Sequence, residues 1–141
     1  MSDLDLTVTK TIPAPIQRVF EAWLQPEALK RFMTPGEGMT VPKAEVDPRE
    51  GGSFLIVMKA GDQEMPHNGE YRTIDRHRRL AFTWRSGYTT EDSLVTIDFK
   101  ELSATETEIT LHHVGFPHVE SRDNHRGGWS AILAQLSRTL G

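Results

Sequence analysis

The apolar side chains of this chain change their spacing along the sequence, and this change restricts the possible folds more than any other feature. Between Phe54 and His113 apolar residues largely alternate with polar ones, which predicts β-strands. After Pro117 they recur every three or four residues, which predicts a helix that begins near Val119 and carries one apolar stripe. That stripe consists of Trp129, Ile132, Leu133, Leu136 and Leu140.

Prolines divide the N-terminal part into a strand and two short helices. A strand is expected from Thr7 to Ile12, and Pro13-Ala14-Pro15 ends it because proline cannot donate to a ladder. Pro15 then opens a helix in which Ile16, Val19, Phe20 and Trp23 share one face. Pro26 opens a second helix, which carries Leu29, Phe32 and Met33 and ends before Pro35-Gly36.

The middle of the chain is predicted to consist of strands joined by short polar turns. Such short connections favour antiparallel hairpins. The run from Phe54 to Met58 is apolar at consecutive positions, so this strand is expected to lie centrally in the sheet. The expected strands cover Phe54–Met58, Gly69–Ile74, Leu80–Arg85, Leu94–Phe99 and Thr107–His113.

This order of elements predicts an α+β fold and a single domain spanning residues 1–141. Strands grouped between helices disfavour a doubly wound parallel sheet. A C-terminal helix about 30 Å long can cross a curved antiparallel sheet. One helix packed into such a sheet tends to leave space at its ends, so we expect a hydrophobic cavity between sheet and helix.

Net charge argues against a nucleic-acid partner. The 141 residues include 16 Lys and Arg and 20 Asp and Glu, for a formal net charge of −4. Nucleic-acid-binding domains usually present a basic face. The arginines between Arg72 and Arg79 lie among acidic residues, which indicates a solvated strand and turn rather than a binding surface.

Composition also bears on compartment. The chain has no cysteine, which excludes disulfides and thiol nucleophiles and is compatible with a reducing cytoplasm. The longest apolar run, Phe54 to Met58, is far shorter than the ~20 residues needed to span a bilayer. Met1 to Asp5 is acidic and leads into no signal-peptide core. We therefore expect a cytoplasmic protein without a membrane span.

Aromatic and thioether side chains are the candidate lining of the cavity. Phe82 and Trp84 share a strand face with Leu80, and all three can be ordinary core residues. Alternatively, their inner ends border a pocket whose walls adapt to flat apolar ligands. The predicted lining is Met58, Tyr71, Phe82, Trp84 and Trp129, together with one histidine.

That histidine is His113. Adjacent strand residues point to opposite faces, so His112 and His113 cannot both enter one pocket. The register of Ile109 and Leu111 places His113 on the apolar face, where a buried imidazole needs a hydrogen-bond partner. His113 is then a structural core residue, a group that orients a ligand, or a general base. Tyr71 is a second polar anchor, because a phenol offers a donor.

Motifs for metal, cofactor or nucleophilic chemistry are missing from the sequence. A metal site needs three or four convergent ligands, and His118 and His125 lack a compact ligand spacing. The serines occupy no nucleophile-elbow context. Gly51-Gly52 precedes a strand instead of opening a helix, so it is no dinucleotide fingerprint. We therefore expect no metal, no cofactor and no catalytic residue assignable from sequence.

Several short strings, taken in order, resemble one known family. They are Pro13-Ala14-Pro15, Val19-Phe20-Glu21-Ala22-Trp23, Pro26-Glu27-Ala28-Leu29, Val46-Asp47-Pro48-Arg49, Gly51-Gly52, Gly69-Glu70-Tyr71, Arg79-Leu80, Phe82-Thr83-Trp84 and Gly127-Gly128-Trp129. Together they are similar to the heat-shock protein 90 ATPase activator homologue-like domains of the START and birch-pollen-allergen (SRPBCC) superfamily. The resemblance implies a helix-grip fold, with a curved antiparallel sheet around the C-terminal helix. Members often have Trp-Trp where this chain has Phe32-Met33.

Three functions are compatible with this resemblance. The first is a soluble protein that binds a small hydrophobic molecule, such as a lipid or an aromatic compound, between the sheet and the C-terminal helix. The second is an enzyme of the polyketide cyclase or hydrolase type, using His113, Tyr71 or Glu70 as acid or base. The third is a protein that modulates a chaperone. The sequence favours binding over catalysis, because it brings no two acid or base groups together.

Overall fold

The computed structural model describes residues 4–34, 36, 38–86 and 93–140. Strands and helices follow one another in the order that the apolar spacing predicts, with one additional strand. In chain order they are β1 (Asp5–Ile12), α1 (Ile16–Ala22), α2 (Pro26–Phe32), β2 (Thr40–Val46), β3 (Ser53–Ala60), β4 (Gln63–Asp75), β5 (Arg79–Thr83), β6 (Leu94–Ser103), β7 (Glu106–Val114) and α3 (Val119–Leu140).

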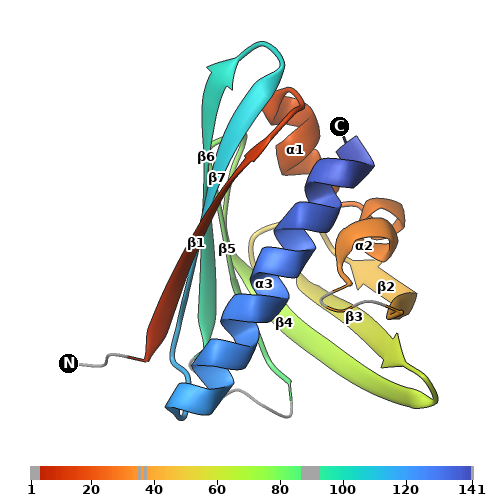
Figure 1. Ribbon diagram of the computed structural model, residues 1–141. Helices are drawn as coiled ribbons and strands as arrows, with labels where there is room; N and C mark the ends of the chain where they lie inside the picture. The colour runs from red at the N-terminus through yellow and green to blue at the C-terminus, as the bar shows by residue number, and fades with distance from the viewer. Residues whose placement is uncertain (1–3, 35, 37, 87–92, 141) are drawn as a thin grey trace.

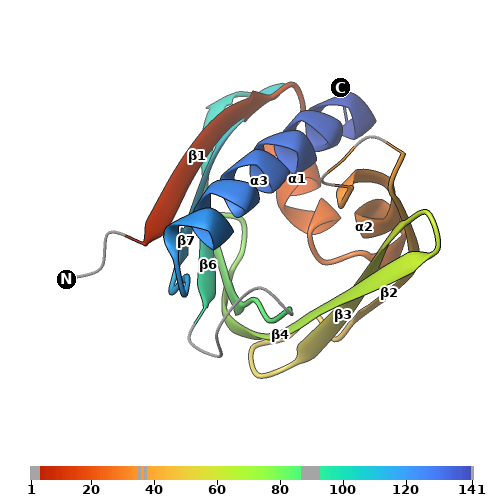
Figure 2. The same ribbon diagram turned by 60° about the horizontal axis from the view of Figure 1, so that its bottom comes forward.

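The strands of the described residues form one antiparallel sheet in the order β1-β7-β6-β5-β4-β3-β2. Hairpins join β2 through β7 in sequence, and β1 closes the far edge against β7. Figure 1 shows α3 lying across this sheet, and Figure 2 shows the sheet curving around α3 with α1 and α2 on the same side. The predicted α+β helix-grip fold is confirmed.

Strand β4 changes its pairing partner along its length. Its first part pairs with β3, and its last residues pair with β5 after a register shift between Tyr71 and Thr73. A bulge of this kind bends a strand. At Gly69, near the bend, a Cβ would overlap the Thr83 carbonyl oxygen and lie 2.8 Å from the Phe54 ring. Glycine is therefore required at position 69, where the backbone of β5 comes close to that of β4.

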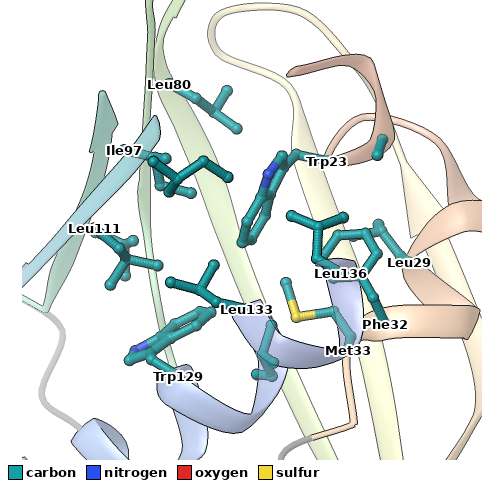
Figure 3. Close-up of a cluster of buried hydrophobic side chains, with 14 of the residues drawn as sticks. Trp23, Leu29, Phe32, Met33, Leu80, Ile97, Leu111, Trp129, Leu133 and Leu136 are labelled. Carbon is teal, nitrogen blue, oxygen red and sulfur yellow. The ribbon is translucent and has the colours of Figure 1, made fainter. Parts of the chain in front are cut away.

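Helix α3 fills the concave face with the apolar stripe that the sequence predicts. Trp129, Ile132, Leu133 and Leu136 are almost completely buried. Figure 3 shows Leu133 and Leu136 lying between side chains of α2 and those of the sheet. The stripe is confirmed, and most of the space between α3 and the sheet is occupied by side chains.

The two short helices begin at the predicted prolines. Pro15 is the N-cap residue of α1, and Pro26 stands in the first turn of α2. Helix α2 ends at Phe32, and the C-cap residue Met33 is buried. Because α2 contacts both β2 and α3, it closes the end of the concave face that α3 does not cover.

Three details of the strand prediction were wrong. Strand β2 was missed because only Val41 on it is buried, and its alternation is too weak to show in sequence. Strand β4 begins at Gln63 instead of Gly69, since pairing with β3 recruits a polar run that contains Pro66. Strand β3 is second from the sheet edge, not central, because β2 alone lies beyond it.

Candidate functional site

A small apolar hollow lies between the N-terminal helices and the strands β3, β4 and β5. Its cavity volume is about 10 Å³, roughly the space of one water molecule. The hollow is therefore close to packed in this structure, and a larger ligand requires side chains to move. We call this space the apolar hollow. It is lined by Trp23, Leu29, Met33, Phe54, Ile56, Tyr71, Phe82 and Trp84.

The sheet side of the apolar hollow is a wall of aromatic rings. Phe54 contacts its neighbours, with ring centroids 5.4 Å from both Tyr71 and Phe82. Phe54 is also stacked on Trp84 at 6.1 Å. These separations are in the range of favourable aromatic pairs, so the rings pack against and support one another.

The helix side is formed by aliphatic and thioether groups. Leu29 and Met33 come from α2 and its C-cap, and Trp23 comes from the C-cap of α1. Trp23 packs edge-on against Phe32, with centroids 5.0 Å apart. Among the described residues that line the hollow, none has a charged side chain. The described lining is therefore apolar apart from the indole N–H and phenol groups.

A buried polar atom on a lining residue lacks a hydrogen-bond partner among the described residues. The Nε1 of Trp23 is buried and makes no hydrogen bond there. Tyr71, whose side chain is 3% exposed, adds a hydroxyl group to the lining. Burial, with the nearby Asp47 carboxylate, raises the pKa of Tyr71, so the phenol stays protonated and remains a donor.

Next to the hollow, the predicted histidine His113 belongs to a fully paired polar group. Trp129 Nε1 donates a hydrogen bond to His113 Nδ1 at 3.0 Å. An indole nitrogen can only donate, so Nδ1 carries the lone pair and the imidazole proton lies on Nε2. His113 Nε2 then donates to Ser93 Oγ, which is also buried.

The position of this proton argues against the alternative that His113 is a catalytic base. A histidine that activates a serine must accept the hydroxyl proton, and His113 Nε2 already holds a proton. Burial, reinforced by His125 and His112, lowers the pKa of His113 to about 2. Among the described residues, no hydrogen bond joins His113 to Tyr71 or Glu70. The geometry therefore argues against His113 as a general base.

Two further histidines complete what we call the histidine cluster, namely His67, His113 and His125. The His67 ring lies 4.9 Å from Trp84, and His125 packs edge-on against His113 at 5.4 Å. His67 Nδ1 donates to the Met65 carbonyl at 3.0 Å. Burial lowers the pKa of His67 to about 4 despite this hydrogen bond.

His125 has the same tautomer as His67. Its Nδ1 donates to the Ser121 carbonyl, one helical turn earlier in α3, at 2.8 Å. Burial lowers the pKa of His125 as well. All three cluster residues are therefore neutral near pH 7. Trp84 connects the cluster to the hollow, since it also lies 4.9 Å from Trp129.

The structure brings only three of the six predicted lining residues together at the hollow. Tyr71, Phe82 and Trp84 line the apolar hollow. The lining, as far as the structure describes the chain, does not include the buried residues Met58, His113 and Trp129. His112 is exposed and pairs with Asp5, so the predicted opposite orientation of the two adjacent histidines is confirmed. Ligand binding by the six residues stays a prediction.

Sequence reasoning missed several residues of both regions. Trp23, Leu29 and Met33 were predicted as helix residues but not as part of the site, because their approach to β3 is a tertiary contact. Ser93 had a usable signal. The β6–β7 hairpin pairs Val95 with His113, and Ser93 precedes Val95 by two residues on the same strand face.

Charged and metal-binding groups do not form a competing site. The described residues hold no group of three or more His, Asp or Glu side chains placed for a metal ion. Three of the four arginines between Arg72 and Arg79 are paired with a carboxylate, which agrees with the solvated-strand interpretation. These pairs are Arg72 with Glu70, Arg76 with Glu21, and Arg79 with Asp98.

No helix among residues 4–34, 38–86 and 93–140 is both long and apolar enough to cross a membrane.

Solved structures share the fold over nearly the whole chain. The protein CV1439 of Chromobacterium violaceum is 26% identical, with a TM-score of 0.88 over 99% of this chain and 98% of its own. NE0264 of Nitrosomonas europaea is 22% identical, with a TM-score of 0.81 over 99% and 96% of the two chains. An AHSA1-like protein of Aeromonas hydrophila is 20% identical, with a TM-score of 0.79 over 95% and 91%.

No curated protein sequence matches the chain significantly. A family model does match, over residues 13–141, and its description is Activator of Hsp90 ATPase homolog 1-like protein. The match begins at the proline that ends β1 and runs through α3. It covers the apolar hollow and the histidine cluster. The chain therefore belongs to the Activator of Hsp90 ATPase homolog 1-like family, within the SRPBCC helix-grip superfamily.

Proposed function

We propose that this protein binds a small hydrophobic or aromatic molecule in the space between the helices and the curved sheet. The observation that carries the proposal is the apolar hollow, whose described lining has aromatic rings on the sheet side and no charged side chain. Members of the family commonly bind hydrophobic ligands. The ligand enlarges the hollow, because the cavity of about 10 Å³ accommodates no more than a water molecule.

The side chain that yields space most easily is Met33. A thioether side chain is unbranched and changes rotamer at low cost. Figure 3 shows its sulfur and methyl pointing toward the Trp23 ring, at the centre of the helix side. If a ligand removes ~200 Å² of apolar surface from water, burial contributes roughly 5 kcal/mol before association costs, which supports micromolar to millimolar affinity.

Acid-base catalysis has less support than binding. The tautomer of His113 makes it a donor to Ser93 rather than a base, and Glu70 is half exposed beside Arg72. A cyclase or hydrolase needs at least two polar groups that converge on a substrate. The polar groups at the hollow, Trp23 Nε1 and Tyr71, are donors suited to orienting a ligand.

Titration with a neutral fluorescent probe, N-phenyl-1-naphthylamine, tests the proposal. The probe should bind saturably with one site per chain and change tryptophan emission, because Trp23 and Trp84 line the hollow. In Ile56→Phe the larger ring occupies the hollow, and the probe Kd should rise at least about tenfold.

Leu102→Phe is the matched control, since Leu102 is 46% exposed on β6 and the substitution adds a similar ring at the surface. Its Kd should equal that of the unmodified protein. Circular dichroism checks that both variants are folded. Unsaturable binding, or equal Kd values for the two variants, would contradict binding in the hollow.

A further inference from the structure

The indole N–H of Trp23 is a buried donor on a residue that lines the apolar hollow. Trp23 is 2% exposed, and its Nε1 has no hydrogen-bond partner in the part of the chain that the structure describes. The nearby Trp129 has equal burial, but its Nε1 donates to His113. Leaving a buried donor unpaired is unfavourable, and native proteins rarely do so without a reason. A bound acceptor would satisfy this donor.

A second donor lies at the same hollow. Tyr71 shares the lining with Trp23 and brings a hydroxyl group to it. The raised pKa of Tyr71 keeps its proton at neutral pH. The described lining residues supply no carboxylate and no cation, so an ionised ligand would lose hydration without gaining a partner among them.

We propose that the ligand is a neutral aromatic molecule bearing a carbonyl group, and that the Trp23 indole N–H donates a hydrogen bond to that carbonyl oxygen. This inference rests on the proposed function and specifies its ligand class. The aromatic part of the ligand packs against Phe54 and Phe82, which present rings from β3 and β5. Tyr71 donates to a second acceptor when the ligand has one. Ketones and quinones fit this description, whereas carboxylic acids do not.

Two probes of the same shape isolate the hydrogen bond. 2-Acetylnaphthalene and 2-isopropenylnaphthalene differ only in replacing a carbonyl oxygen by a methylene group. In the unmodified protein the ketone should bind more tightly than hydrophobicity alone predicts. In Trp23→Phe, which keeps an aromatic ring but removes the N–H, the ratio of the two dissociation constants should shift about tenfold against the ketone.

Phe82→Leu is the matched control variant. Phe82 lines the hollow but has no polar atom, so its substitution should weaken both probes by the same factor and leave their ratio unchanged. Isothermal titration gives both constants for each protein. Thermal unfolding of each variant shows whether it is folded.

A measurement on the unmodified protein keeps the test independent of the variants. The three tryptophans give three indole proton signals in a ¹⁵N-edited spectrum. The Trp23 signal is the one that is missing in Trp23→Phe; if that variant does not fold, the signal is assigned by other means. This signal should move downfield when 2-acetylnaphthalene is added. It should move little with 2-isopropenylnaphthalene.

The outcomes separate the inference from the function on which it rests. If both probes bind but the ratio stays the same in Trp23→Phe and the Trp23 indole proton does not respond to the ketone, the carbonyl anchor is wrong and apolar binding stands. If neither probe binds saturably, the proposed function and this inference fail together. Tighter binding of 2-naphthoate than of the ketone would overturn the neutral-ligand assignment alone.

Discussion

The apolar hollow and the histidine cluster occupy adjoining parts of the same concave sheet face, with Trp84 in contact with both. In the cluster, both ring nitrogens of His113 are paired: Trp129 donates to His113, and His113 donates to Ser93. At the hollow, Trp23 Nε1 has no partner among the described residues, and Trp23 lines a small space. Both regions are similarly buried, so burial alone does not distinguish them.

This difference separates residues that hold the fold together from residues available to a ligand. A paired buried polar group fixes one arrangement of side chains, because breaking any one hydrogen bond leaves its partner unsatisfied. An unpaired donor on a residue that lines the hollow can take a new partner. We therefore propose that the cluster serves stability and the hollow serves binding.

The largest expected effect comes from the core that both regions share. Leu133 on α3 is fully buried between them, and Leu133→Ala should destabilise the protein by about 2–5 kcal/mol through lost burial and a residual cavity. Chemical denaturation measures this value. Leu102→Ala at the exposed surface of β6 is the control and should change stability little. An unchanged midpoint in Leu133→Ala would contradict the packing of α3 on the sheet.

A pair of identical substitutions tests the comparison directly. Trp129→Phe removes the donor to His113 Nδ1 and leaves a buried acceptor unsatisfied, which should cost about 1–3 kcal/mol beyond the effect of the smaller ring. Trp23→Phe makes the same change in side-chain size but breaks no hydrogen bond among the described residues. Trp23→Phe should therefore be clearly the milder of the two in denaturant. Equal losses would remove the distinction between paired and unpaired regions.

The histidine cluster should also make stability depend on pH. Burial lowers the pKa of His67 to about 4 and that of His113 to about 2, from 6.5 in the unfolded chain. Below pH 6.5 the unfolded state therefore binds protons that the folded state does not. The contribution of the neutral buried histidines to the free energy of unfolding is complete above pH 6.5. It declines as pH falls towards 4, by up to about 1.4 kcal/mol per pH unit for each histidine.

Two histidine variants measure this slope. Thermal or denaturant unfolding between pH 7 and pH 4.5 should show a flatter decline in His67→Gln than in the unmodified protein. His112→Gln is the control, since His112 is about half exposed on the opposite face of β7. A slope that is the same in His67→Gln and His112→Gln would show that His67 is protonated in the folded protein.

Most of the fold could be predicted because periodicity reports which face of an element is buried. The stripe on α3 and the opposite orientations of His112 and His113 both follow from local spacing. Strand β2 could not be predicted, since only Val41 on it is buried. An edge strand of this kind forms because it pairs with its neighbour, and local sequence does not show that pairing. The early start of β4 depends in the same way on β3.

The site could be predicted only in part, because it depends on contacts between distant elements. Tyr71, Phe82 and Trp84 share one sheet face, so strand register was enough to group them. The contribution of Trp23 and Met33 depends on how α1 and α2 pack, which no local pattern reports. The hydrogen bonds of His113 required both the hairpin register and the position of α3.

The smallest expected effect concerns Gly127, which lies in the middle of α3 two residues before Trp129. It is exposed, and a Cβ there would meet nothing within 4 Å. Gly127→Ala should therefore stabilise the helix by roughly 0.5–1 kcal/mol, because alanine loses less backbone entropy than glycine. Gly61→Ala is the matched control, since Gly61 has equally open surroundings but a φ of +61°, where alanine is strained and destabilising.

The same Gly127 variant sharpens the comparison between the two regions when probe binding is measured beside stability. If the histidine cluster only supports the fold, a stiffer α3 next to Trp129 raises the unfolding midpoint and leaves the Kd of 2-acetylnaphthalene unchanged. The ligand then needs only Met33 and its neighbours to move. Weaker binding in Gly127→Ala would mean that α3 must bend for the ligand to enter. Because Trp84 contacts Trp129 at 4.9 Å, that coupling would pass through the pair of indoles and make the cluster part of the binding site.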